Sequence, residues 1–323
     1  MQNGHNGDGA GIARQRTLKS AIHCSGVGLH NGLRVSLTLC PALPDTGILF
    51  RRLDLPEGQN EIAANWRNAI ETPLCTTLVG DNGATVSTIE HLMSALAGCG
   101  IDNAVVELTG SEVPIMDGSA SPFLFLIDCA GTVEQAVPRR AIRILKPVSV
   151  AEESRAAHLR PGDGFMVDFE IDFENPVIAR QHWQVEVDRH SFRSEIAPAR
   201  TFGFLADVEK LRALGLARGG SLDNAVVIEG DRILNEGGLR FDNEFVRHKA
   251  LDSIGDLYLA GAPIIGRFEG YCAGHALTLR LLRALFAEQD AWTWSDQPAV
   301  QGAPRPYQIG PSVPPQRAVA TPA

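Results

Sequence analysis

The sequence lacks paired cysteines, long apolar stretches and a secretion-like leader. Its six cysteines are scattered singly over 323 residues without a CxxC pair, so we expect reduced thiols in a cytoplasmic protein rather than a disulfide framework. No apolar run approaches the roughly 20 residues of a membrane-spanning helix, and the polar, Gly-rich residues 1–17 contain no apolar core of a signal peptide. We therefore expect no stable insertion into a membrane.

The sequence also lacks a positive net charge and the common nucleotide-binding motifs. The formal charge of −9 disfavours nucleic acid as a partner, although a single nucleotide needs only a few local groups. Neither GxGxxG nor GxxxxGK[ST] occurs, which excludes the dinucleotide and P-loop patterns, and HExxH is absent as well.

The length and pattern of the chain favour two domains. With 44% hydrophobic and 21% charged residues, the composition is that of an ordinary globular protein. We expect an N-terminal domain over 14–136 and a C-terminal domain over 137–295 with a βαβ insert near 204–228. The Gly-rich segment 1–13 and the Pro-rich segment 296–323 are expected to be flexible tails.

The two halves of the chain resemble each other in outline. Each begins with strand-like alternation, at 33–42 and at 165–173. Each later has an amphipathic helix, a Gly-rich turn and a β-branched strand, at 88–108 and at 244–270. The pattern predicts an α+β fold of two similar α/β-sandwich domains, with helices packed against sheets and a small insert in each.

The strongest local signal is the run RHKALDSIGD, which places His248, Asp252 and Asp256 at positions i, i+4 and i+8 of a predicted helix. Imidazole and carboxylate one turn apart can bind the same zinc ion. An isolated HxxxD is more often a solvated polar stripe, but apolar Leu251 and Ile254 on the same helix favour a stripe that faces a cleft.

A second signal is the pair Glu90-His91 at the start of a predicted helix, after Ser87 and Thr88 as candidate N-caps. Glu90 could simply complement the helix dipole. Alternatively, His91 is a metal ligand and Glu90 a general base beside it. Aligning the glycines that follow the two helices puts His91 opposite Asp252, which suits a metal site between the domains.

Two further candidates carry weaker signals. His275 opens a predicted helix after a small-residue turn, and a lone histidine is more often structural than catalytic. Thr201, in ARTFGF, could be a strand hydroxyl and nothing more. His30, in GVGLHNG, is the one remaining histidine that we keep in view, without a role.

Taken together, several segments resemble the UDP-3-O-acyl-N-acetylglucosamine deacetylase family, which acts in lipid A biosynthesis of Gram-negative bacteria. They run in family order over about 270 residues. The segments are GVGLHNG (26–32), VSTIEHLMSALAGCGIDNAVVEL (86–108), PIMDGSASPF (114–123), ARTFGF (199–204), LNEGGLRFDNEFVRHKALDSIGDLYL (234–259) and GHAL (274–277).

The resemblance implies roles for the candidate residues. By this resemblance His91, His248 and Asp252 hold a Zn²⁺ ion, with the remaining position for water, and Glu90 is the general base. The further catalytic residues that it implies are the acid/base group His275, its orienting carboxylate Asp256, the oxyanion-binding hydroxyl of Thr201 and the basic residue Lys249, which also lines the substrate site.

The same resemblance implies a site for a lipid-linked nucleotide sugar. Phe173 matches an aromatic side chain near the uracil, and Phe202 is a second substrate-binding candidate. The insert near 204–228 matches a passage for the acyl chain. We expect a monomer that removes the N-acetyl group of UDP-3-O-acyl-N-acetylglucosamine. The rivals are a zinc hydrolase of another acylated amine and a non-catalytic protein that binds UDP-sugars or acyl chains.

Overall fold

A computed structural model describes residues 13–72 and 74–296 of the chain. The first half of the described chain contains β1 (Arg14–Leu18), β2 (Ile22–Val27), β3 (Arg34–Pro41), β4 (Ile48–Arg52), β5 (Glu61–Ala63), β6 (Ala69–Ile70), β7 (Thr77–Val79), β8 (Thr85–Ser87), α1 (Glu90–Cys99), β9 (Ala104–Leu108), α2 (Ser121–Ala130) and β10 (Thr132–Pro138).

The second half contains β11 (Arg140–Ile144), β12 (Val148–Glu152), β13 (Arg155–Arg160), β14 (Phe165–Asp172), β15 (Arg180–Glu186), α3 (Arg189–Ser191), the π-helical turn η1 (Phe192–Ile196), β16 (Phe202–Phe204), α4 (Leu205–Ala213), β17 (Val226–Glu229), β18 (Arg232–Ile233), α5 (Glu244–Leu257), the 3-10 turn η2 (Tyr258–Ala260), β19 (Ile264–Tyr271), α6 (His275–Ala287) and β20 (Trp292–Asp296).

Two large sheets carry the fold, one from each half of the chain. The first has the order β2-β3-β9-β4-β5, and the second has the order β12-β13-β19-β11-β20 with β14 and β15 joined to β19. In each sheet the strand that follows a long helix, β9 or β19, has neighbours on both sides. The two halves therefore repeat one arrangement, and the predicted α+β fold is confirmed.

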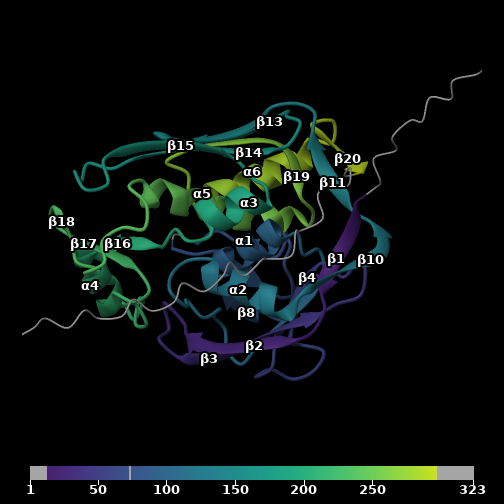
Figure 1. The fold of residues 1–323 in the computed structure, drawn as a ribbon, viewed down its shortest axis with the longest axis horizontal. Helices are drawn as coiled ribbons and strands as arrows, with labels where there is room; N and C mark the ends of the chain where they lie inside the picture. The colour runs from purple at the N-terminus through teal and green to yellow at the C-terminus, as the bar shows by residue number, and fades with distance from the viewer. Residues whose placement is uncertain (1–12, 73, 297–323) are drawn as a thin grey trace, which may run out of the picture.

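The helices lie between the sheets. Figure 1 shows α5 and α6 beneath the sheet of β13, β14 and β15, and α1 and α2 above β2 and β3. Alternating burial explains this layering, because Leu37 and Leu39 of β3 and Phe169 of β14 are fully buried against the helices. Helix α1 packs on α5 and α5 on α6, so the interface between the halves is made of helices.

Glycines end the two central helices, as the sequence predicted. Gly100 follows α1 with a φ of 67°, and its N–H bonds to the Ala97 carbonyl. Gly261 follows α5 and η2 with a φ of 85°. Both are left-handed positions that glycine adopts without a Cβ penalty. After each glycine the chain continues into a strand. His91 lies nine residues before the first glycine and Asp252 nine residues before the second.

Small sheets form the two inserts. Strands β6, β7 and β8 make one, and β16, β17 and β18 the other. In the second insert β16 and β17 are parallel with α4 between them, which is the βαβ unit predicted near 204–228. Figure 1 shows this insert at one end of the molecule and the β1-β10 ribbon at the other.

The predicted tails fall almost wholly outside the described residues. The exceptions are Ala13, whose carbonyl accepts a hydrogen bond from the Arg139 N–H, and Asp296, the last residue of β20. Among the helices that the structure describes, none combines the length and apolar character needed to cross a bilayer.

We predict that Gly255→Ala destabilises the fold through the contact between α1 and α5. A Cβ at Gly255 would lie 2.1 Å from the Glu90 carbonyl oxygen, which is closer than atoms can approach. Overpacking of this kind costs about 1–3 kcal/mol or more, whereas alanine otherwise favours a helix. Thermal unfolding measures the loss, and Gly237→Ala is the matched control, since nothing lies within 4 Å of a Cβ there. An unchanged melting temperature for Gly255→Ala would contradict the close contact.

Candidate metal centre and active site

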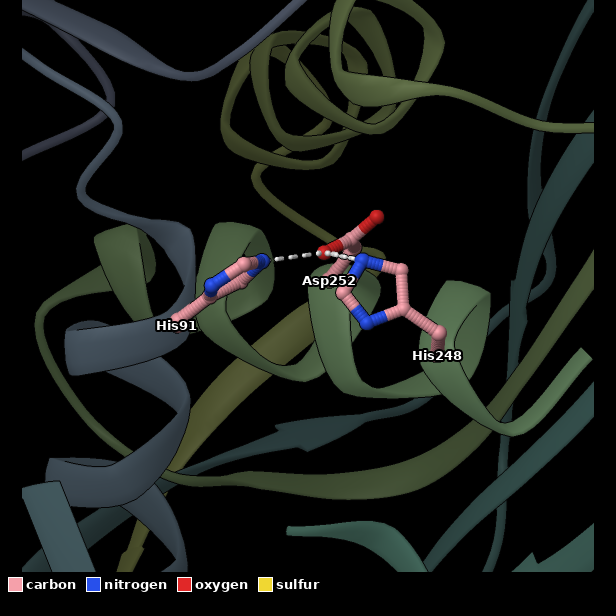
Figure 2. Close-up of side chains that lie close together, drawn as sticks. All are labelled: His91, His248 and Asp252. Atoms are coloured by element: carbon pink, nitrogen blue, oxygen red, sulfur yellow. Dashed lines mark ion pairs between the residues drawn. The ribbon is translucent and has the colours of Figure 1, made fainter. Parts of the chain in front are cut away.

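Three buried side chains from the two central helices converge at the interface between the halves of the molecule. Asp252 Oδ1 lies 3.5 Å from His91 Nε2 and 3.3 Å from His248 Nε2. One ligand atom from each residue falls within 4.8 Å of the others. Figure 2 shows His91 reaching from α1 toward Asp252 and His248, which come from successive turns of α5. The three residues could therefore hold a metal ion, as predicted.

The ring of His248 is oriented by the backbone. Its Nδ1 lies 3.1 Å from the Ala199 carbonyl oxygen, so Nδ1–H donates to that oxygen. The lone pair is then on Nε2, which faces Asp252. Burial lowers the pKa of His248 to about 4, so the imidazole is neutral. A neutral imidazole whose far nitrogen is held by a carbonyl is the usual state of a metal-bound histidine.

The Asp252 carboxylate is the anionic member of the cluster. Burial alone would raise its pKa, but since the His248 imidazole is neutral, it is the Lys249 ammonium at Oδ2 that holds the pKa of Asp252 well below its usual range. Its Oδ1 is buried and has no hydrogen-bond partner within the described part of the chain. Since a buried carboxylate oxygen without a partner is unfavourable, a cation bound to Oδ1, His91 and His248 would satisfy it. The donor set of two imidazoles and one carboxylate fits zinc, leaving a fourth position open.

Glu90 begins α1, next to His91, but the predicted N-caps are wrong. Residue Ile89 occupies the N-cap position without a side-chain cap, and Thr88 has a left-handed φ of 58°. The Thr88 hydroxyl instead donates to Glu112, which also accepts the backbone N–H of His30. The helix start is thus fixed by contacts to a neighbouring loop.

The Glu90 carboxylate is buried beside the cluster. Its side chain is held from outside the helix, because Oε2 accepts the backbone N–H of Thr76 at 3.0 Å. Burial raises the pKa of the Glu90 carboxyl. A raised pKa makes this carboxylate a better proton acceptor than an exposed one.

His275 and Asp256 form a pair on the other side of Asp252. His275 Nδ1 lies 2.8 Å from Asp256 Oδ2, and His275 Nε2 lies 4.0 Å from Asp252 Oδ2. Burial would lower the pKa of His275, but the Asp256 carboxylate raises it to about 9. The structure therefore brings a protonated imidazole to the metal-ligand cluster.

Lys249 places a second positive charge in the site. Its Nζ donates to Asp252 Oδ2 at 2.7 Å. Burial would lower its pKa, but the Asp252 carboxylate raises the pKa of Lys249, so the ammonium is charged. Together with Asp256 and His275, these side chains line a narrow recess.

The remaining predicted residues lie along the edge of the second insert. The ring of Phe202 is 6.2 Å from that of His248, and the ring of Phe173 is 5.9 Å from Phe202. Thr201 stands between Ala199 and Phe202, and its N–H donates to the Gly118 carbonyl. Both aromatic candidates therefore extend from the metal-ligand cluster toward the insert. The insert also has a hollow of about 460 Å³, lined in part by Phe204 and Ile228.

The sequence did not reveal Thr76 or the carbonyl of Ala199, although both contact the site. Thr76 touches Glu90, Asp256 and His275. A single threonine in an unremarkable segment has no motif that could have marked it. His30 was kept in view without a role, and neither of its ring nitrogens has a hydrogen-bond partner among the described residues.

Comparison with known families gives this geometry its context. The model of the family described as UDP-3-O-acyl N-acetylglycosamine deacetylase matches residues 15–287, which is most of the chain. The chain belongs to this family. The segment matched includes all of the site residues described above, from Thr76 to His275.

Curated relatives in this deacetylase family align with this chain over nearly their full lengths. A UDP-3-O-acyl-N-acetylglucosamine deacetylase of Marinobacter nauticus is 56% identical over 87% of this chain and 92% of its own length. Proteins with the same name are 55% identical in Acidithiobacillus ferrooxidans, over 88% and 94%, and 52% identical in Chromobacterium violaceum, over 94% and 99%.

Proposed function

We propose that the protein is a zinc-dependent deacetylase that hydrolyses the N-acetyl group of UDP-3-O-(3-hydroxyacyl)-N-acetylglucosamine, the committed step of lipid A biosynthesis. The products are acetate and the free amine. The observation that carries the proposal is the buried meeting of His91, His248 and Asp252 beside two proton-transfer groups. The names of relatives at 52–56% identity support the substrate.

The chain's own residues would perform the proton transfers. A zinc ion held by His91, His248 and Asp252 would lower the pKa of a bound water to about 7 and polarise the acetyl carbonyl. Glu90 accepts a proton from the water as the water oxygen attacks the carbonyl carbon. The raised pKa of Glu90 favours this transfer.

His275 acts on the acetyl oxygen and is one of two candidate proton donors to the leaving amine. As an imidazolium it stabilises the negative charge that develops on the acetyl oxygen, with the Thr201 hydroxyl as a second donor. When the carbon–nitrogen bond breaks, the amine nitrogen takes a proton from His275 or from Glu90. Asp256 keeps His275 charged for this step, since the carboxylate raises its pKa to about 9.

The substrate's other groups would contact the residues that surround the cluster. Lys249 supplies a charged donor in the recess next to Asp252. Phe173 and Phe202 offer aromatic faces toward the nucleotide end, and the second insert would take the acyl chain.

All six cysteines, each within the described residues, are free, which supports a cytoplasmic location.

The test of this proposal is direct assay of acetate release from UDP-3-O-acyl-N-acetylglucosamine, with UDP-N-acetylglucosamine and N-acetylglucosamine in parallel. Turnover confined to the acylated nucleotide sugar is the expected result. Equal turnover of simple N-acetyl sugars would favour a hydrolase of other acylated amines. Binding without acetate release would favour a non-catalytic UDP-sugar or acyl-chain protein.

We predict that Asp256→Asn moves the alkaline limb of the pH–kcat profile to lower pH. The Asp256 carboxylate raises the pKa of His275 to about 9, so the imidazolium persists from acid pH up to that point and is lost above it. Without the anion, burial lowers this pKa, and the active protonated form disappears at a lower pH. An alkaline limb at the wild-type position would contradict a role for the His275 imidazolium in turnover.

A further inference from the structure

Thr76 lies between the two proton-transfer groups of the site. It is buried with 5% of its surface exposed, one residue before β7 in the first insert. Its backbone N–H donates to Glu90 Oε2 at 3.0 Å. Its hydroxyl donates to Asp256 Oδ1 and lies 3.2 Å from His275 Nδ1. One residue thus joins α1, α5 and the start of α6.

The hydroxyl contact settles how the Asp256 carboxylate is oriented. With Oδ1 bonded to Thr76, Oδ2 is the oxygen that meets His275 Nδ1, at 2.8 Å. The imidazole is then fixed with Nε2 on the side of Asp252. A threonine hydroxyl has one proton to donate and two lone pairs, so it can donate to Asp256 while a lone pair faces the His275 Nδ1–H that Asp256 Oδ2 accepts.

The segment that carries Thr76 is itself held against α6. Strand β6 pairs with β7, and the Ala69 carbonyl in β6 accepts from Arg283 at 3.0 Å. Glu71 bonds Arg280 at 2.8 Å and Arg283 at 2.7 Å, and both arginines are in α6. Because His275 is the first residue of α6, the first insert and the imidazole are anchored to the same helix.

We propose that Thr76 is a positioning residue that sets the geometry of both proton-transfer groups. Its N–H holds Oε2 of Glu90 in place and leaves Oε1 as the oxygen without this contact, available for the water's proton. Its hydroxyl locks Asp256, and through Asp256 the imidazole of His275. This inference rests on the proposed deacetylase activity, but it concerns a residue for which the sequence and the family resemblance indicated no role.

The test compares Thr76→Val, which keeps shape and removes the hydroxyl, with Thr76→Ser, which restores it. Outer partners of catalytic ligands typically contribute 10–100-fold, so we expect Thr76→Val to lower kcat about 10–100-fold. The KM should change by less than about threefold, because ground-state binding is untouched. Thr76→Ser should return kcat to within about threefold of wild type. Thr77→Val is the matched control, since the Thr77 hydroxyl has Cys75 Sγ as its neighbour at 3.7 Å.

Three further measurements separate the possible failures. Metal content and melting temperature are recorded for each variant, and Thr76→Ala replaces Thr76→Val if the latter does not fold. NMR of ¹⁵N-histidine-labelled protein reports the His275 Nδ1–H directly. Its signal should shift in Thr76→Val and return in Thr76→Ser, whether or not the protein turns over the substrate.

The outcomes are distinguishable. Wild-type kcat in Thr76→Val, or a loss of kcat that serine does not rescue, would overturn the positioning role. If the wild-type protein releases no acetate, the proposed deacetylase activity fails. In that case an unchanged His275 signal in Thr76→Val would overturn the positioning role as well, and a shifted signal rescued by serine would support it.

Discussion

Glu90→Gln is expected to lower kcat by about 10²–10⁴-fold while the metal remains bound, because general-base catalysis contributes about that much. The amide keeps the size of the side chain. Its oxygen can still accept the Thr76 N–H, which in the wild-type protein donates to Glu90 Oε2. It cannot accept a proton from water. Since Glu90 is not among the three residues that converge on the metal position, the metal content should stay unchanged.

The matched control for this variant is Glu107→Gln. Glu107 lies in β9, where its carboxylate pairs with Arg51 at 3.0 Å and is part-exposed. Steady-state kinetics on the acylated nucleotide sugar and metal analysis of both variants provide the measurement. Turnover of Glu90→Gln within a few-fold of wild type would remove Glu90 from the mechanism, whereas loss of metal would make it a ligand or a structural support.

His248→Ala is expected to abolish both metal binding and turnover. The imidazole is one of the three proposed ligands, it is buried, and its orientation is fixed by the Ala199 carbonyl. The loss of activity should exceed the 10–100-fold that is typical of changes to the outer partners of a metal site. Removing the imidazole also leaves Asp252 with fewer polar neighbours, so the apoprotein should melt at a lower temperature.

His190→Ala serves as the control, since His190 is an exposed histidine in α3. Metal content measured by plasma mass spectrometry should fall well below one ion per chain in His248→Ala and remain at the wild-type value in His190→Ala. A His248→Ala protein with a full complement of metal would show that the ion is bound elsewhere.

The group of candidate metal ligands could be predicted because the sequence patterns that indicate it are local. His248 and Asp252 are one helical turn apart, a spacing that puts both on one face of α5. His91 was placed opposite Asp252 by counting back from two glycines, and both glycines do adopt the left-handed conformation that ends a helix. Residue spacing and glycine chemistry are properties that a sequence displays directly.

The contacts that orient the site could not be predicted, because they join distant parts of the chain. Thr76 meets Asp256 across 180 positions and His275 across 199. The N-cap prediction failed for the same reason, since Thr88 bonds Glu112 instead of the helix start. Tertiary contacts decided what these hydroxyls bind, and local preference did not.

The architecture shows the same division. Alternation along 165–173 predicted strand β14, but nothing in it indicated that β14 would lie between β15 and β19. Likewise β1 and β10 pair across more than a hundred residues to form a separate ribbon. Periodicity identifies an element and its buried face, whereas strand order depends on how the faces of distant elements fit together.

The most direct test of the account is a metal titration of the full-length protein. The chain is stripped with a chelator, and acetate release from UDP-3-O-acyl-N-acetylglucosamine is followed as zinc is returned. The account predicts no turnover without metal and a linear recovery that ends at about one zinc ion per chain, as expected for the single three-ligand site. Full activity in the stripped protein, or a recovery of activity that does not depend on the amount of added zinc, would contradict a reaction centred on His91, His248 and Asp252.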